Sequence, residues 1–214
     1  MTKLKPINLY LVASQKYCQE KNILDIAQEA IYAGIDILQM REKSLERNQL
    51  LNLGKELAKL CKINQVMFIV NDDPGLAKTL DADGVHLGQE DILSFPIKEV
   101  RTILGQKKVI GLSTHSIKQV ETANSFDLDY IGFGPIFSTK TKSYTIGTEE
   151  IEQALQISKV PVVIIGGITS ENIRQVLNKG ATNIAVIREI VQAKNVKEKV
   201  LQLKKIIKGQ NDEN

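Results

Sequence analysis

The chain has little of several residue types that specialised proteins need. Its 214 residues include no tryptophan, two cysteines and 5% aromatic residues. Its 28 basic and 25 acidic residues leave a net charge of only +3, so there is no basic stripe to bind nucleic acid. Cys18 and Cys61 lie in helix-like segments without the spacing of metal ligands. We therefore expect a reduced, cytoplasmic protein without a nucleic-acid partner.

Long apolar segments are also missing. No apolar run approaches the ~20 residues that span a bilayer, so no membrane partner is expected. The start, residues 1–8, lacks the apolar core of a secretory signal, because charges and a proline interrupt it. Residues 1–214 are predicted to form one domain, with a flexible tail at 209–214. The sequence leaves open whether the chain forms a homo-oligomer.

Apolar runs of strand length alternate with amphipathic segments of helix length along the whole chain. The runs are rich in valine and isoleucine, as strands buried on both faces are. The predicted strands are Ile7–Ser14, Ile35–Glu42, Gln65–Asp72, Gly84–Gly88, Lys108–Ser113, Asp129–Phe137, Pro161–Ile168 and Asn183–Ile190. Eight strand–helix units predict an α/β fold, the (β/α)8 TIM barrel. The alternative, an open doubly wound sheet, favours a Gly-x-Gly-x-x-Gly turn after the first strand, which this sequence lacks.

The second predicted strand ends in polar residues. Gln39, Arg41 and Lys43 alternate along the strand and therefore share one face. In a barrel, the carboxyl end of a strand faces the active site. Two cations on one face repel each other unless an anion lies between them, and guanidinium matches phosphate well. The pattern favours a phosphate site, and the alternative is a solvated strand end in which Arg41 pairs with a carboxylate.

Acidic and amide residues follow the next two strands. Asp73 stands before a proline, which is typical of a helix start, and this leaves Asn71 and Asp72 as oxygen ligands for a hard cation. Glu90 and Asp91 follow the neighbouring fourth strand, within reach of Asp72. Mg²⁺ usually binds one or two carboxylates plus substrate phosphates. Beside the cationic face, these residues suggest a magnesium–pyrophosphate site.

Three later segments add polar groups to the same end of the predicted barrel. Ser113 and His115 share a face of the fifth strand, but the absence of a nearby acidic partner disfavours a Ser–His nucleophile. Ser113 is instead expected to bind a substrate, and His86 to be a satisfied barrel-wall residue. Residues 134–147 form either a second anion site, a lid or an ordinary polar loop. Gly166 and its glycine neighbour end the seventh strand, where such barrels bind phosphate.

Read in order, these motifs resemble the thiamine phosphate synthase family from Leu11 to Ile190. The motifs are Gln-x-Arg-Glu-Lys at 39–43, Val-Asn-Asp-Asp at 70–73, His-Leu-Gly-Gln-Glu-Asp at 86–91, Gly-x-Ser-x-His-Ser at 111–116, Gly-Pro-Ile-Phe at 134–137, Thr-x-Thr-Lys at 139–142 and Ile-Gly-Gly-Ile at 165–168. The resemblance implies a (β/α)8 barrel that joins a pyrimidinylmethyl diphosphate to a thiazole phosphate. It also implies Mg²⁺ as cofactor and pyrophosphate as the second product.

The resemblance assigns a role to each matching position. Arg41, Lys43, Ser113 and Lys142 would form the catalytic set, and Asp72 and Asp91 would bind Mg²⁺. The implied substrate-binding residues are Gln39, Arg41, Lys43, Asn71 and Ser113 for the pyrimidine diphosphate, Thr139, Thr141 and Lys142 in the closing loop, and Gly166, Ile187 and Arg188 for the thiazole phosphate. The implied reaction is dissociative, which asks the protein for charge neutralisation and positioning.

Two departures from the family pattern leave alternatives open. Arg188 stands where the family usually has serine, and the span from Lys142 to Gly147 is shorter than usual. One alternative is the related thiazole tautomerase, whose proton-transfer histidine matches His115. That isomerase does not account for Asp72 and the acidic residues after the fourth strand. The other alternative is a non-catalytic phosphate-binding paralogue, in which Arg188 abolishes thiazole binding.

Overall fold

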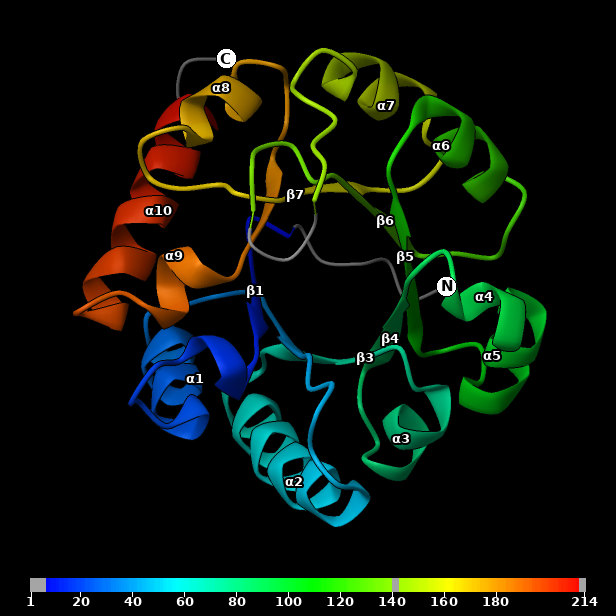
Figure 1. The fold of residues 1–214 in the computed structure, drawn as a ribbon, viewed down its shortest axis with the longest axis vertical. Helices are drawn as coiled ribbons and strands as arrows, with labels where there is room; N and C mark the ends of the chain where they lie inside the picture. Colours follow the sequence, from blue (N-terminus) through cyan, green and yellow to red (C-terminus); the bar gives the residue numbers. More distant parts are fainter. Residues whose placement is uncertain (1–6, 140–142, 212–214) are drawn as a thin grey trace.

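Eight parallel strands close into a barrel in which neighbours in sequence are neighbours in space (Figure 1). The computed structural model describes residues 7–139 and 143–211. The strands are β1 (Leu9–Ala13), β2 (Ile37–Met40), β3 (Met67–Asn71), β4 (Gly84–Leu87), β5 (Val109–Thr114), β6 (Tyr130–Phe133), β7 (Val162–Ile165) and β8 (Asn183–Val186). The ring closes where β1 pairs with β8, with Leu9 opposite Ile184. The predicted TIM barrel is confirmed.

Most strands are shorter than the apolar runs that predicted them. β6 ends at Phe133, four positions before the predicted Phe137, because Pro135 has no N–H to donate to a neighbouring strand. β8 ends at Val186, before the predicted Ile190, because the chain turns directly into a helix. Apolar side chains beyond these points pack in loops and short helices, so the runs overstate the strands.

A helix follows every strand, and together the helices surround the barrel (Figure 1). They are α1 (Ile23–Tyr32), α2 (Arg47–Asn64), α3 (Pro74–Thr79), α5 (Ile97–Leu104), α6 (Ile117–Ala123), α7 (Ile151–Ile157), α8 (Ile173–Leu177) and α10 (Val196–Asn211). Three short elements that were not predicted lie in the loops after β1, β4 and β8: the 3-10 turn η1 (Gln15–Tyr17), α4 (Asp91–Ser94) and α9 (Arg188–Val191).

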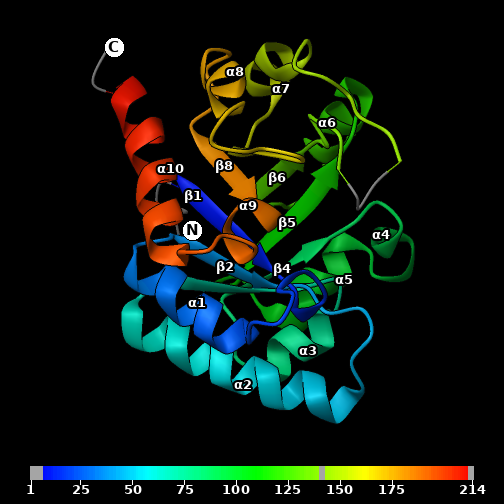
Figure 2. The ribbon, with the colours of Figure 1, turned by 60° about the vertical axis from the view of Figure 1, so that its left-hand side comes forward.

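The last helix extends into the segment that was predicted to be a tail. α10 continues to Asn211, so residues 209–211 are helical, and 212–214 lie outside the described residues. Figure 2 shows α10 along the side of the barrel next to α1 and α9, where it joins the last unit to the first. Its apolar residues Val196, Val200 and Leu203 are fully buried against this surface. Within 7–139 and 143–211, no helix has the length and apolar character to cross a bilayer.

The strands bury both of their faces. Side chains such as Leu38 and Ile131 point outward into the layer beneath the helices, whereas Ile37, Ile69 and Val109 point into the barrel. Successive residues on a strand face opposite sides, so this alternation produces two cores. The core inside the barrel includes two tyrosines, Tyr10 and Tyr130, among its apolar side chains.

A polar side chain recurs at the amino end of every even-numbered strand and ties it to the strand before. The Asp36 carboxylate, before β2, accepts the backbone N–H of Leu9 on β1 at 2.9 Å. The equivalent residues of β4, β6 and β8 are Asp83, Asp129 and Asn183, each bonded to the backbone of the preceding strand at 2.8–3.0 Å. The same kind of side chain–backbone hydrogen bond thus joins the two strands of each of four successive pairs.

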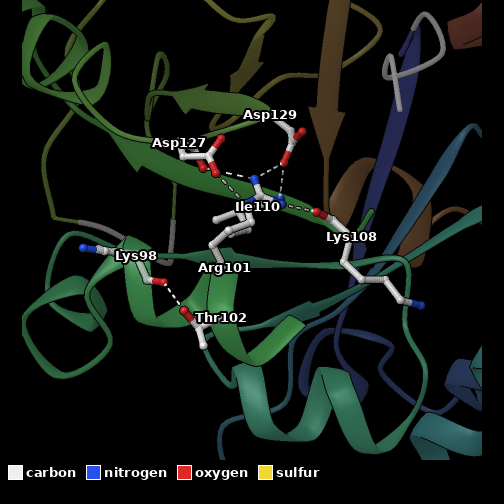
Figure 3. A network of polar contacts seen from close by, with 7 residues as sticks. All are labelled: Lys98, Arg101, Thr102, Lys108, Ile110, Asp127 and Asp129. Carbon is white, nitrogen blue, oxygen red and sulfur yellow. Dashed lines mark hydrogen bonds and ion pairs between the residues drawn. The ribbon is translucent and has the colours of Figure 1, made fainter. Parts of the chain in front are cut away.

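A buried arginine reinforces one of these contacts (Figure 3). Arg101 on α5 has a side chain that is only 7% exposed. Its guanidinium donates to the carboxylates of Asp127 and Asp129 at 2.9 and 2.8 Å and to the carbonyls of Asp127 and Lys108. A buried charge needs such complete pairing. The cluster lies at the amino ends of β5 and β6, away from the polar end of the barrel.

Candidate active site

A cavity of about 690 Å³ lies at the carboxyl ends of the strands, and every strand contributes to its wall. Of the predicted site residues, those that line it are Gln39, Arg41, Asn71, Ser113, Thr139, Gly166, Ile187 and Arg188. Lys43, Asp72 and Asp91 lie next to this set but do not line the cavity. Thr141 and Lys142 lie outside the described residues. One end of the barrel therefore collects residues that are widely separated in sequence.

The residues that end β2 separate into a buried amide and two cations. Gln39 is 3% exposed, and its Nε2 donates to the Tyr10 hydroxyl at 2.7 Å. Arg41 lines the cavity and forms no ion pair with any residue that the structure describes, so the carboxylate partner considered above is not seen. Lys43 Nζ lies 3.1 Å from Asp72 Oδ2 and is largely exposed. The cavity wall thus carries an unpaired guanidinium, which suits an anion.

Two carboxylates meet beside these cations. Asp72 follows β3 in a left-handed conformation, φ +66°, and its N–H donates to the His86 carbonyl on β4 at 2.8 Å. Asp91 begins α4, and its carboxylate accepts the Gly88 N–H at 2.6 Å. Burial raises the pKa of the Asp91 carboxyl, and a hydrogen bond with Asp72 raises it further. The two carboxyls are therefore near neighbours, as the sequence predicted.

Asp73 has the structural role that was expected of it. It is the N-cap of α3, where its side chain accepts the Leu76 N–H at 2.7 Å. Its other oxygen pairs with Arg47 at 2.6 Å. Both oxygens of the Asp73 carboxylate therefore have partners outside the cavity.

A chain of hydrogen bonds crosses the barrel between residues that line the cavity. From Gln39 it passes through the hydroxyls of Tyr10 and Tyr130, which lie 2.9 Å apart, and continues to His86 Nδ1 at 2.9 Å. His86 Nε2 lies 2.9 Å from Ser113 Oγ. Burial lowers the pKa of His86 to about 4, so its ring is neutral at pH 7. His86 is thus the satisfied wall residue that was predicted, and it is also the neighbour of Ser113.

His115 does not partner Ser113, because β5 ends at Thr114 and His115 lies in the following loop. Its Nδ1 is bonded to the Gly134 carbonyl, and its ring contacts Tyr144 edge-on at 5.9 Å. The disfavoured Ser–His nucleophile is therefore not assembled from this pair. The serine instead contacts a neutral histidine, and no carboxylate completes a triad within the described residues.

The loops after β7 and β8 form the opposite wall of the cavity. Gly166 has φ +108°, and a Cβ there would lie 2.3 Å from Pro135 Cα, so only glycine fits. Arg188 lines the cavity with both glycines and forms no ion pair with a described residue. The neighbouring Glu189 pairs with Lys199 at 2.8 Å instead. Arg188 therefore reaches the cavity with its charge available, as expected.

Tyr10 and Tyr130 were not predicted as site residues, yet both line the cavity. Each lies within an apolar strand, where a tyrosine is usually core. The signal that could have identified them is the tyrosine hydroxyl, which needs a hydrogen-bond partner when it is buried. Only the closed barrel brings the two hydroxyls together, since the residues are 120 positions apart.

Comparison with known proteins agrees with this geometry. The family model for thiamine monophosphate synthase matches residues 9–190. The thiamine-phosphate synthase of Halalkalibacterium halodurans is 39% identical over 91% of this chain and 92% of its own length. That of Persephonella marina is 38% identical over 95% and 97%. The structure of a thiamine phosphate pyrophosphorylase from Pyrococcus furiosus superposes with a TM-score of 0.87 at 32% identity, covering 96% of this chain and 97% of that one.

These similarities extend over nearly the full length of the chain and include the segments that form the cavity wall. Both the sequence match and the structural superposition lead to the same group of proteins. The chain therefore belongs to the thiamine monophosphate synthase family of transferases.

Proposed function

We propose that the cavity joins 4-amino-2-methyl-5-(diphosphooxymethyl)pyrimidine to a thiazole phosphate, forming thiamine phosphate and pyrophosphate. The observation that carries the proposal is the meeting of two cations at the end of β2 with two carboxylates after β3 and β4. Arg41 lines the cavity, and Lys43 lies 3.1 Å from Asp72, which is the neighbour of Asp91. This mixture of charges suits a diphosphate accompanied by a divalent cation.

Asp72 and Asp91 are proposed to hold Mg²⁺. Two carboxyls that share a hydrogen bond form a site in which a cation can replace the shared proton. The described residues contain no group of three or more His, Cys, Asp or Glu side chains that could hold a metal ion. Two protein carboxylates are what Mg²⁺ commonly uses, with water and substrate phosphates as its other ligands. When bound, Mg²⁺ supplies charge neutralisation to the diphosphate.

The proposed reaction is dissociative. The bond between the methylene carbon and the diphosphate oxygen breaks first, and the pyrimidine amino group stabilises the resulting cation. The thiazole nitrogen then captures that cation. Arg41 and Lys43, with Lys142 from the resemblance, would neutralise the leaving pyrophosphate, while Asn71 and Ser113 would position the ring. Such a reaction needs no general base, and burial lowers the pKa of His86 to about 4, which makes its ring a weak base.

The thiazole phosphate is proposed to bind at the ends of β7 and β8. Gly166 and Ile187 line this wall, and Thr139 lies on the facing loop, with Thr141 of the same loop assigned by the resemblance. The Arg188 guanidinium supports the proposal because it lies in the cavity without an acidic partner among the described residues. We therefore assign Arg188 to phosphate binding rather than to obstruction of the site.

Incubation of the purified protein with both substrates tests the reaction. We expect thiamine phosphate and pyrophosphate in equal amounts when Mg²⁺ is present, and neither product when a chelator removes it. Pyrophosphate without thiamine phosphate, or no product at all, would contradict the proposal. The second outcome would favour the non-catalytic paralogue. Rearrangement of a thiazole phosphate without pyrophosphate would favour the tautomerase.

Asp72→Asn separates the metal role from a structural one. The amide keeps the size of the side chain but removes a carboxylate charge, so we expect turnover to fall about ten- to a hundredfold, the range known for disturbed metal sites. Thermal stability should change little, because the partner Lys43 is exposed and such pairs contribute about 1 kcal/mol or less. Equal turnover in the variant and the parent protein would remove Asp72 from the proposed site.

A further inference from the structure

A hydrogen-bonded chain of five residues runs along the wall of the cavity. Gln39 and Ser113 stand at its ends, and the hydroxyls of Tyr10 and Tyr130 and the ring of His86 lie between them. Each of the four contacts is 2.7–2.9 Å long. Both tyrosines are at most 2% exposed. Because the tyrosine hydroxyls between the two ends are buried and bonded to each other, the hydrogen atoms of the chain adopt one consistent order.

The order follows from counting hydrogen atoms. Gln39 Nε2 can only donate, so the Tyr10 oxygen accepts from it and the Tyr10 hydrogen is left for Tyr130. The Tyr130 hydroxyl must then donate to His86 Nδ1. A neutral imidazole that accepts at one nitrogen donates at the other, which makes Nε2–H the donor to Ser113 Oγ.

The reverse order leaves a hydrogen atom without a partner. If Ser113 donated to His86, the Tyr130 hydroxyl would donate to Tyr10, whose oxygen already accepts from Gln39. The Tyr10 hydrogen would then have no acceptor within the described residues. An unpaired buried hydroxyl is costly. The ring of His86 stacks on Tyr130 with centroids 5.4 Å apart, which also opposes rotation of the imidazole.

We propose that Gln39, Tyr10, Tyr130 and His86 are positioning residues that hold the Ser113 hydroxyl as a hydrogen-bond donor toward the cavity. This inference rests on the proposed function and adds which substrate groups Gln39 and Ser113, at the two ends of the chain, recognise. Ser113 presents a hydrogen atom, and Gln39 presents Oε1, which has no partner among the described residues. A ring nitrogen accepts and an exocyclic amine donates, so an aminopyrimidine matches both ends. A ring with a carbonyl in place of the amine does not match Gln39.

The tautomer of His86 tests the order in the free protein, without any reaction. The chain has two histidines, and a His115→Gln variant assigns their ¹⁵N signals. At pH 7 we expect His86 Nε2 to carry the hydrogen and Nδ1 to be bare. In Gln39→Glu the carboxylate can only accept from Tyr10. The direction of the hydrogen bonds along the chain should therefore reverse, and the imidazole hydrogen of His86 should move to Nδ1. A Nδ1–H form or an equal mixture in the parent protein, or no reversal in Q39E, would overturn the inference.

The hydrogen-bonded chain from Gln39 through Tyr10, Tyr130 and His86 is called the relay below. A double-mutant cycle tests whether this relay acts through Ser113. Tyr130→Phe and Ser113→Ala should each lower kcat/KM for the pyrimidine diphosphate about tenfold, the effect of one lost hydrogen bond. Together they should be no worse than Ser113→Ala alone. Tyr17→Phe, which removes a hydroxyl outside the relay, should leave kcat/KM unchanged. A hundredfold loss in the double variant would indicate a merely structural role and overturn the inference. If Y130F does not fold, Tyr10→Phe replaces it in the cycle.

The two measurements fail independently of each other. If no thiamine phosphate forms but the tautomers behave as expected, the proposed function fails and the relay remains. If the product forms but His86 carries its hydrogen on Nδ1, the relay fails and the proposed function remains.

Discussion

Removal of the Arg101 guanidinium should destabilise the barrel without affecting its chemistry. In Arg101→Ala, two ion pairs and two bonds to backbone carbonyls disappear from a side chain that is 7% exposed. Loss of one partner of a buried pair costs about 3–5 kcal/mol. Asp127 is 62% exposed and Asp129 is 26% exposed, so water relieves part of that penalty. We therefore expect the lower end, about 3 kcal/mol of unfolding free energy.

For a chain of this size, about 3 kcal/mol corresponds to a fall in Tm of roughly 6–12 °C. The matched control is Arg47→Ala, which breaks an Arg–Asp contact of 2.6 Å whose partners are 53% and 40% exposed. An exposed pair contributes about 1 kcal/mol or less. Calorimetry of both variants measures the difference. Equal, small shifts in Tm would refute the argument that burial makes the Arg101 cluster stabilising. A fall in kcat/KM of R101A at temperatures where it is folded would refute the claim that the cluster does not affect the chemistry.

Three further predictions concern the cavity. Arg41→Ala should weaken pyrophosphate binding by about 1.5–3 kcal/mol, the contribution of a charged hydrogen bond; calorimetric titration measures this, and unchanged affinity would make Arg41 a structural residue. Arg188→Ser should weaken thiazole-phosphate binding, whereas tighter binding would show that the arginine obstructs the site. The pKa of His86 falls from 6.5 to about 4 on folding, so the unfolded chain binds the extra proton between these values and stability should decline as pH drops from 7 toward 4, by up to about 3 kcal/mol. His86→Asn should remove that part of the decline in urea unfolding curves.

Much of the fold and part of the site followed from local pattern. The apolar runs indicated eight strands in order because parallel strands buried on both faces leave a continuous signal. Gln39 and Arg41 were assigned to the cavity by their alternation along β2, and both line it. Strand ends were less accurate. The run through Ile190 contains a strand and a helix, and apolar spacing does not distinguish the two over a few residues.

The sequence by itself determined the barrel and the strand ends at which polar residues gather, because both depend on periodicity and on residue type within short segments. Only the tertiary structure decided how those residues are paired. Tyr10 and Tyr130 have the appearance of core residues until closure of the ring places their hydroxyls 2.9 Å apart. Likewise, Ser113 contacts His86 on the neighbouring β4 rather than His115, two residues away in sequence. Hydrogen bonds depend on distance in space, which a closed sheet sets through register and curvature.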